Sequence, residues 1–240
     1  RWEEADLLVA NILEIALEVS PERHLLWQWA KLKNDYLKSG DRETYLRQLQ
    51  AIPDMVESFR ASEVLSSRDF TRSLETILRL KSDTFIRWGA ARFTTSHFVE
   101  ALIHLEVGNQ QKVQETNNQV NSHLTNIVEM NPQADPIYWG SLEVSHALGG
   151  DTAAMEAAMQ KTREISGTKF WQFRRQADCE VLVALAHTIL GHDDKAITIL
   201  EGADRIKSPR IIYREVGLAF YFDRLRGNPR FDAFLKGGTP

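Results

Sequence analysis

The sequence predicts an all-α fold, built as an α-α superhelix from stacked helix hairpins. Three observations support this fold: apolar residues recur at helical spacing, glycine and proline separate segments of helical length, and some glycines recur at a near-constant interval. Strand signals are weak, because no Asn-Gly turn joins two alternating runs. A sheet in the middle of the chain would therefore contradict the prediction.

The spacing of the glycines indicates a repeat. Gly108, Gly149 and Gly191 lie 41 and 42 residues apart, and each ends one amphipathic run and begins another. Gly40 has the same place earlier in the chain, with an additional helix predicted at about 67–81. Helix pairs at a constant period are typical of α-solenoids, in which each pair buries its apolar face against its neighbours. The alternative is an irregular all-α domain in which this spacing is coincidental.

The composition excludes several classes of protein. The 240 residues are 43% hydrophobic and 26% charged, as in ordinary globular proteins, and the formal net charge of −4 argues against a surface made to bind nucleic acid or anionic membranes. No apolar run approaches the ~18 residues of a membrane span. The single cysteine, Cys179, excludes an internal disulfide and a thiolate zinc site. We expect a cytoplasmic location, or a periplasmic one if a membrane segment lies upstream.

Two segments carry a family resemblance. Residues 178–209 resemble a tetratricopeptide repeat in their small residues and turn positions, which are Ala184, Gly191, Ala196, Leu200, Ala203 and Pro209. Residues 220–231 resemble the closing motif of many bacterial tetratricopeptide arrays, where a short Pro-Arg-Phe helix seals the last repeat.

The resemblance implies one continuous solenoid. Its first part, residues 1–130, would be a degenerate helical-repeat half, and residues 131–240 would be tetratricopeptide-like repeats with a C-terminal capping helix. It also implies the C-terminal array of a bacterial multidomain signalling protein, with a kinase, cyclase or DNA-binding domain upstream. The first residue, Arg1, agrees with a piece of a longer chain.

The sequence predicts no catalytic residues, resident metal or cofactor, and hence no enzyme. His97, Glu100 and His104 fall on one face of a predicted helix and resemble a transition-metal ligand set. The two histidines are ~10.5 Å apart along the helix axis, so a polar stripe is favoured over a metal or small-molecule site. His192, Asp193 and Asp194 are interpreted as helix-capping residues, and Cys179 as a buried thiol.

In a solenoid the first helix of each pair lines the concave face. This rule places nine side chains in one predicted binding groove: Arg87, Arg92, His97, His104, Tyr138, Glu143, His146, Arg174 and Arg175. Arginines there would bind an acidic peptide or its terminal carboxylate through charge-assisted hydrogen bonds, whereas the alternative is a solvated polar face.

The predicted function is a non-enzymatic protein–protein interaction module. It would bind a peptide, a partner protein or its own upstream domain in the groove, with no direct nucleic-acid binding by this region. The alternative is an oligomerisation or regulatory domain, a homodimer through its terminal helices, that controls an attached kinase, cyclase or transcription factor.

Overall fold

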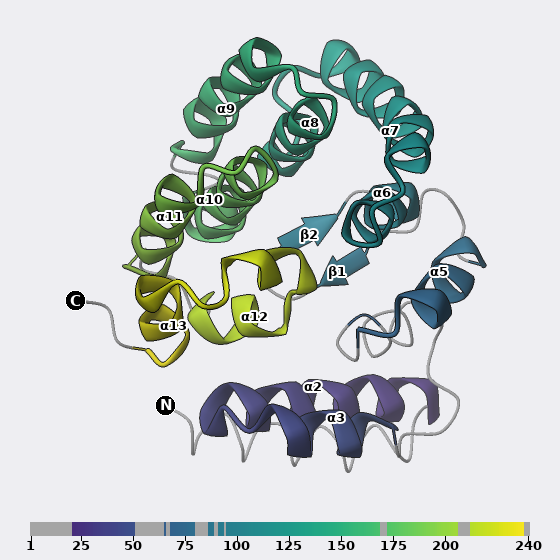
Figure 1. Cartoon of the computed structure of the whole chain (residues 1–240), viewed down its shortest axis with the longest axis vertical. Coiled ribbons are helices and arrows are strands. Elements are labelled where there is room, and N and C mark those ends of the chain that lie inside the picture. Colours follow the sequence, from purple (N-terminus) through teal and green to yellow (C-terminus); the bar gives the residue numbers. More distant parts are fainter. Residues whose placement is uncertain are drawn as a thin grey trace.

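The computed structural model describes residues 21–50, 65, 68–79, 86–88, 91–93, 95–168, 172–205 and 212–237. The side chains of the predicted groove residues Arg87, Arg92 and Arg174 lie outside the described part of the structure. The described chain is overwhelmingly helical, which confirms the all-α class (Figure 1).

The helices follow one another around an arc (Figure 1). In chain order the described elements are α2 (Pro21–Ser39), α3 (Arg42–Gln50), α5 (Phe70–Leu78), β1 (Ile86–Trp88), β2 (Ala91–Phe93), α6 (Ser96–Glu106), α7 (Gln110–Met130), α8 (Pro136–Leu148), α9 (Thr152–Ser166), α10 (Gln172–Ile189), α11 (Asp193–Arg205), α12 (Ile212–Leu218), the 3-10 helix η1 (Phe220–Leu225) and α13 (Pro229–Leu235).

Consecutive helices from α6 to α11 pack as antiparallel pairs. Helix α6 packs on α7, α8 on α9 and α10 on α11, while α7 also contacts α8, and α8 contacts α10. Helix α10 is the most deeply buried of the first helices: every residue from Ala177 to Thr188 is buried except Glu180. Each pair therefore depends on its neighbours for the burial of its apolar surface.

The turns within these pairs share one geometry. Gly108, Gly150 and Gly191 have φ of 75°, 73° and 75°, in the left-handed region where a side chain is strained. In each turn the residue after the glycine donates its backbone N–H, over 2.9 Å, to the carbonyl of a histidine near the end of the preceding helix. The histidines are His104, His146 and His187. The turns are thus a true structural repeat.

This geometry corrects the predicted register. Gly149, which the sequence analysis placed in the repeat, has φ of −80° and ends α8 in a right-handed conformation, and Gly150 makes the turn. Because Gly149 and Gly150 are adjacent, both fit the repeat interval about equally well. Only the backbone angle φ shows which of them makes the turn.

A short antiparallel hairpin is the one departure from helices in the described residues. Strands β1 and β2 pair with Ile86 opposite Phe93, Arg87 opposite Arg92 and Trp88 opposite Ala91. The prediction that no sheet interrupts the chain is wrong here, although two strands of three residues leave the described chain predominantly helical. Strands of three residues are too short for alternation to be recognised, so the sequence pattern missed them.

The N-terminal helices meet the C-terminal elements. Arg68 precedes α5 with an unusual φ of 63° and donates Nε and Nη2 to the two carboxylate oxygens of Asp223 in η1, at 2.8 and 2.9 Å. The ring of Phe70 lies 5.3 Å from that of Phe220. One continuous apolar core consequently runs from Leu65 to Phe234.

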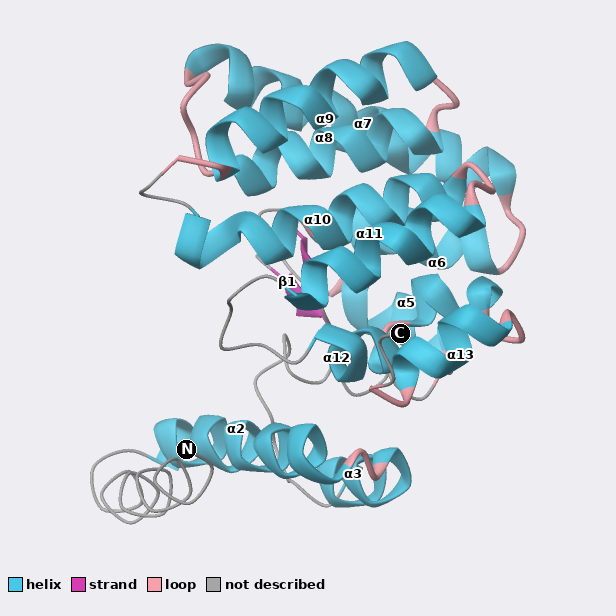
Figure 2. Cartoon of the chain, turned by 90° about the vertical axis from the view of Figure 1, so that its left-hand side faces the viewer, coloured by secondary structure: helices cyan, strands magenta, loops and turns pink. Residues whose placement is uncertain are grey.

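Helices α2 and α3 form a separate layer beneath this body (Figure 2). They reach it through a small second apolar cluster in which Tyr36 and Tyr45 pack with Leu218 of α12. The contact between α2–α3 and α12 is called the seam below.

The turn geometry predicts opposite outcomes for neighbouring glycines. Gly150→Ala should lower the free energy of unfolding by about 1–2 kcal/mol, because alanine resists the left-handed conformation. Gly149→Ala should change it by less than about 0.5 kcal/mol or raise it, because alanine favours the helical angles found there. Urea denaturation of both variants measures the difference, and an equal or inverted response would contradict the assigned register.

Candidate functional site

The first helices α6, α8 and α10 carry most of the predicted groove residues, and the chain's own hairpin lies against them. Strand β2 contacts all three helices, and Figure 1 shows the hairpin on the inner side of the arc. Arg87 and Arg92 lie on this hairpin, opposite one another across its two strands. The face predicted to receive a partner thus already holds an extended segment of this protein.

His97, Glu100 and His104 are brought together on α6, as their spacing predicts. The two Glu100 oxygens lie 3.9 Å from His97 Nδ1 and 3.7 Å from His104 Nε2, and the His97 side chain is 36% exposed. Among the residues that the structure describes, no group of three or more His, Cys, Asp or Glu side chains is arranged to hold a metal ion. The geometry is that of a carboxylate between two imidazoles on a polar helix face.

Arg175 lies in an ion-pair network. Its Nε is 2.7 Å from Asp135, whose carboxylate also accepts the Ile137 N–H at the start of α8, and its Nη1 is 3.7 Å from Asp178. The arginine therefore ties α10 to the N-terminus of α8. Its position fits a structural bond better than capture of a peptide carboxylate.

Tyr138 and His146 also make internal contacts. Tyr138 is half-buried and packs against the main apolar core. His146 Nδ1 lies 3.4 Å from Asn121 Nδ2 of α7, and burial lowers the pKa of its imidazole. The predicted groove residues whose side chains are described consequently make contacts within the protein. The His97 side chain is partly exposed to solvent.

Glu143 departs furthest from the prediction, because it is completely buried. It lies seven positions before its turn glycine, where the neighbouring repeats have Ala101 and Ala184. Neither carboxyl oxygen has a hydrogen-bond partner. Glu143 therefore does not line an open groove.

Burial raises the pKa of Glu143 well above its ordinary value. Arg163 opposes this shift, but its guanidinium already binds Glu180 at 3.2 Å, and the Glu180 charge raises the pKa of Glu143 further. Burial thus favours the neutral form of this carboxyl group.

Two further candidates have structural roles. Cys179 is buried and its thiol has a raised pKa, chiefly because of burial, as expected for an inert thiol. His187 Nδ1 lies 3.3 Å from His192 Nδ1, and burial with nearby cationic groups lowers the pKa of His187 to about 4. This histidine is therefore neutral at physiological pH, and its Nδ1 lies within hydrogen-bonding distance of the neighbouring ring across the turn.

Neither the seam nor the repeat of the histidines was predicted from the sequence. Tyr36 and Arg214 are 178 positions apart, and no spacing rule could pair them. The histidines did carry a signal, since each of His104, His146 and His187 stands four residues before its turn glycine.

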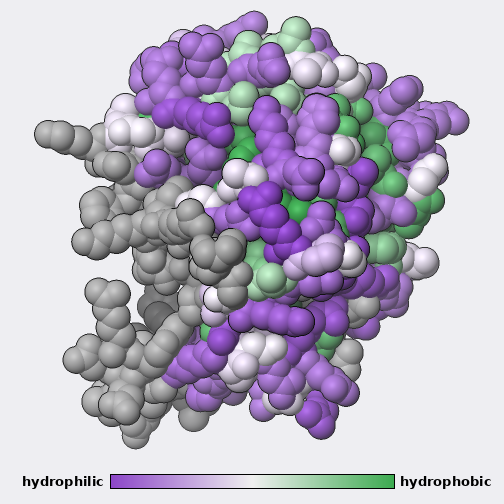
Figure 3. Space-filling model, turned by 60° about the vertical axis from the view of Figure 1, so that its left-hand side comes forward, coloured by the Kyte–Doolittle hydropathy of each residue, from purple (hydrophilic) through white to green (hydrophobic). Residues whose placement is uncertain are grey.

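The surface shows what kind of contact it offers. On the face drawn in Figure 3 hydrophilic residues cover most of the described part, and hydrophobic areas appear separately between them. The exposed large hydrophobic residues among those described, Leu78, Val107 and Met130, lie on different elements.

Comparison of the chain with protein-family models, with curated proteins and with solved structures gave no match. None of the helices in the described ranges combines the length and apolar character that crossing a membrane requires.

The buried acid predicts a pH-dependent difference in stability. A carboxyl group with a raised pKa in the folded state stabilises that state fully at low pH, and this stabilisation is lost as pH rises through the folded pKa. Glu143→Gln removes the titration, so the free energy of unfolding of the variant should gain on that of the wild type as the pH rises from about 5, above the ordinary pKa of a glutamate, toward neutrality, by at most ~1.4 kcal/mol per pH unit.

Urea denaturation across this pH range tests the prediction. Glu129→Gln, at an exposed position of α7, is the matched control and should show no such trend. A difference between Glu143→Gln and wild type that does not vary with pH would show that Glu143 is ionised or solvated in the folded protein.

Proposed function

We propose that this chain is a non-enzymatic protein-interaction module, in which the helix pairs form an α-α superhelix of the tetratricopeptide type. The support is the repeated turn at Gly108, Gly150 and Gly191, together with the packing of each helix pair against the next along the chain. In this proposal the module belongs to a larger bacterial signalling protein and binds a peptide, a partner protein or an upstream domain.

The observation that carries the proposal is the position of the β1–β2 hairpin. Strand β2 contacts α6, α8 and α10, so one extended segment of the chain already lies beside the three first helices. A partner would bind beside the hairpin, at the rim of this surface, where His97 is partly exposed. Glu143 is excluded from that contact by its burial.

Quantitative affinity capture tests this surface. His97→Glu places a negative charge beside Glu100 at the rim, and Lys112→Glu makes a charge reversal on the exposed face of α7. We expect wild type and the Lys112 variant to capture the same protein, and the His97 variant to capture roughly tenfold less of it, as for loss of a hot-spot contact. If both variants captured the same amount of the partner, the proposal that the partner binds at the rim near His97 would be wrong.

A second candidate function, regulation of an attached domain, is favoured by the seam. Tyr36 Oη donates to the carbonyl of Arg214 over 2.8 Å, and Arg214 Nη1 donates in return to the carbonyl of Leu37. Lys33 Nζ lies 3.3 Å from Glu215 Oε1, with both side chains largely buried. A domain attached before α2 would be coupled through these contacts to the C-terminal elements.

A charge swap tests the coupling. Lys33→Glu should destabilise the seam by about 1–3 kcal/mol, because it sets two carboxylates together in a buried place, and adding Glu215→Lys should restore part of the loss. Hydrogen exchange of residues 31–48 provides the measurement.

The control for the charge swap is Lys31→Glu. Lys31 forms a surface pair with Asp35, with 52% and 41% of the two side chains exposed, so this change should have little effect. If Lys33→Glu exchanges no faster than this control, α2 is not held at α12 by the ion pair.

A further inference from the structure

The turn between α10 and α11 brings two imidazole rings into contact. His187, in the last turn of α10, is buried with 1% of its surface exposed, whereas His192, immediately before α11, is exposed to water. Their Nδ1 atoms lie 3.3 Å apart and the ring centroids 5.6 Å apart. A hydrogen bond between the rings requires that one Nδ1 carries a proton and that the other offers a lone pair. Two protonated rings therefore cannot make this contact.

The buried ring is also poorly placed to take a second proton. His187 Nε2 is buried and has no hydrogen-bond partner among the described residues. A neutral imidazole can donate through Nδ1 and keep Nε2 unprotonated, but a protonated imidazole carries an N–H on both nitrogens. Protonation of His187 would consequently bury a positive charge together with a donor that lacks an acceptor.

The charged groups that act on His187 are cationic. Lys195 of α11 and Arg163 of α9 lower the pKa of its imidazole, as does His192, and burial is the largest cause. From η1, Arg224 reaches the same turn, since a Cβ atom on Gly191 would lie 3.7 Å from its Nη2. A proton added to His187 would thus enter a group of cations.

The remaining elements around His187 do not compensate. Asp193 and Asp194 lie in the first turn of α11, and neither is among the groups that act on His187. Helix α8 packs on α10 and carries Glu143 and His146, which do not act on it either. Strand β2 also contacts α10 and has Arg92 as its charged residue. No described carboxylate therefore opposes the cations at this ring.

The balance of these effects decides the response to acid. The C-terminal end of a helix favours a cation, but burial and the neighbouring charges outweigh this, because the pKa of His187 falls from 6.5 to about 4. In an opened turn the ring is hydrated and titrates near its ordinary value. Since the open form binds the proton more tightly, lowering the pH from 7 to 5 favours opening.

The other two turns of the repeat differ in their charges. His104 Nε2 lies 3.7 Å from a carboxylate oxygen of Glu100, which is a counter-ion for the protonated ring. His146 lies beside the Asn121 amide, and the charge of Asp151 raises its pKa against the effect of burial. Each of these histidines has a carboxylate acting on it, whereas cations act on the histidine of the α10–α11 turn.

We propose that the His187–His192 pair is an acid-sensitive switch, in which protonation of both rings opens the turn and loosens α11 from α10. The switch does not rest on the proposed partner surface.

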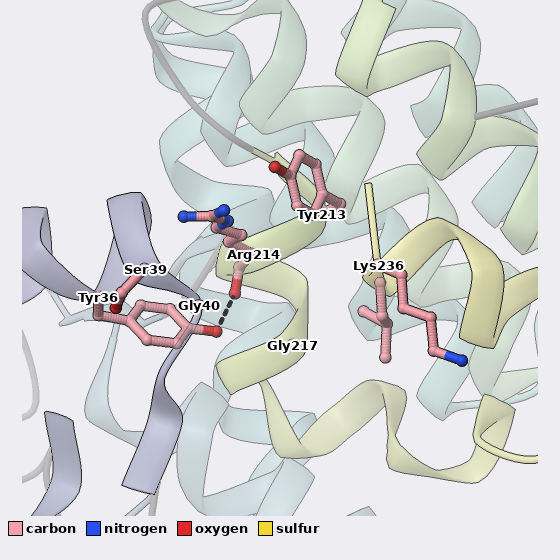
Figure 4. A pocket seen from close by; sticks show the side chains of 8 residues that line it. Tyr36, Ser39, Gly40, Tyr213, Arg214, Gly217 and Lys236 are labelled. Atoms are coloured by element: carbon pink, nitrogen blue, oxygen red, sulfur yellow. Dashed lines mark hydrogen bonds between the residues drawn. The ribbon is translucent and has the colours of Figure 1, made fainter. Parts of the chain in front are cut away.

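The contacts of α11 carry this change to the C-terminal elements. Helix α11 packs on α12 and α13, and its Glu201 accepts from Arg230 of α13 over 2.6 Å. Helix α12 forms the seam, where the Tyr36 hydroxyl donates to the Arg214 carbonyl (Figure 4). Mild acid would therefore loosen the C-terminal elements before the helix pairs from α6 to α9.

Hydrogen exchange of the whole chain at pH 7 and pH 5 tests the switch, with protection calculated against the intrinsic exchange rate at each pH. A pKa of about 4 in the closed turn and 6.5 in the open turn makes opening roughly 20-fold more favourable at pH 5. We expect the protection of residues 190–200 to fall by about this factor. The protection of residues 104–115, in the turn between α6 and α7, should change much less.

Three variants identify the titrating group. His187→Gln keeps a donor and an acceptor but does not titrate, so the loss of protection at pH 5 should disappear. Lys195→Gln removes an exposed cation that lowers the pKa of His187, so it should reduce the loss, and it keeps the test valid if His187→Gln does not fold. His123→Gln, at an exposed position of α7, is the matched control and should respond as wild type does.

Three results would overturn the switch. The first is unchanged protection of residues 190–200 at pH 5 in the wild type. The second is an equal loss in residues 104–115, which would show that acid weakens the whole stack. The third is a loss in His187→Gln as large as that in wild type, or in Lys195→Gln where the first variant does not fold.

Discussion

The left-handed turn after each first helix is the constraint on which this architecture depends. At Gly108, Gly150 and Gly191 the backbone adopts angles that L side chains resist, and the reversed chain then lays its second helix against the first. The same N–H to histidine carbonyl bond closes every turn. Because the pairs enter the stack with one geometry, α8 can pack on α10 and bury both helices.

Burial of the first helices also decides which polar residues remain available for function. A fold that hides one face of a helix must either neutralise or pair its polar side chains. Arg175 is paired with Asp135, Glu100 lies between two histidines, and burial favours the neutral form of Glu143. The polar character that attracted attention in the sequence is thus largely used within the protein.

The sequence predicted the helices and the turns more successfully than the site. Glycine spacing depends on local backbone chemistry, so it revealed the repeat to within the Gly149–Gly150 ambiguity. The strands at 86–88 and 91–93 gave no periodic signal, and their place against three helices is a tertiary property. Glu143 was assigned to an exposed face because helix position alone does not say what covers it. The seam depends on pairs such as Tyr36 and Arg214, which are remote in sequence and share no motif.

The bond between Arg68 and Asp223 has a consequence for biogenesis. It joins positions 155 apart, so residues near 68 are translated long before their carboxylate partner leaves the ribosome. During that time the Phe70 ring lacks Phe220, and the loop that must close is nearly two-thirds of the chain. The helix pairs between them form from local contacts and shorten the distance to be closed. The ends are therefore expected to join last, after the stack is complete.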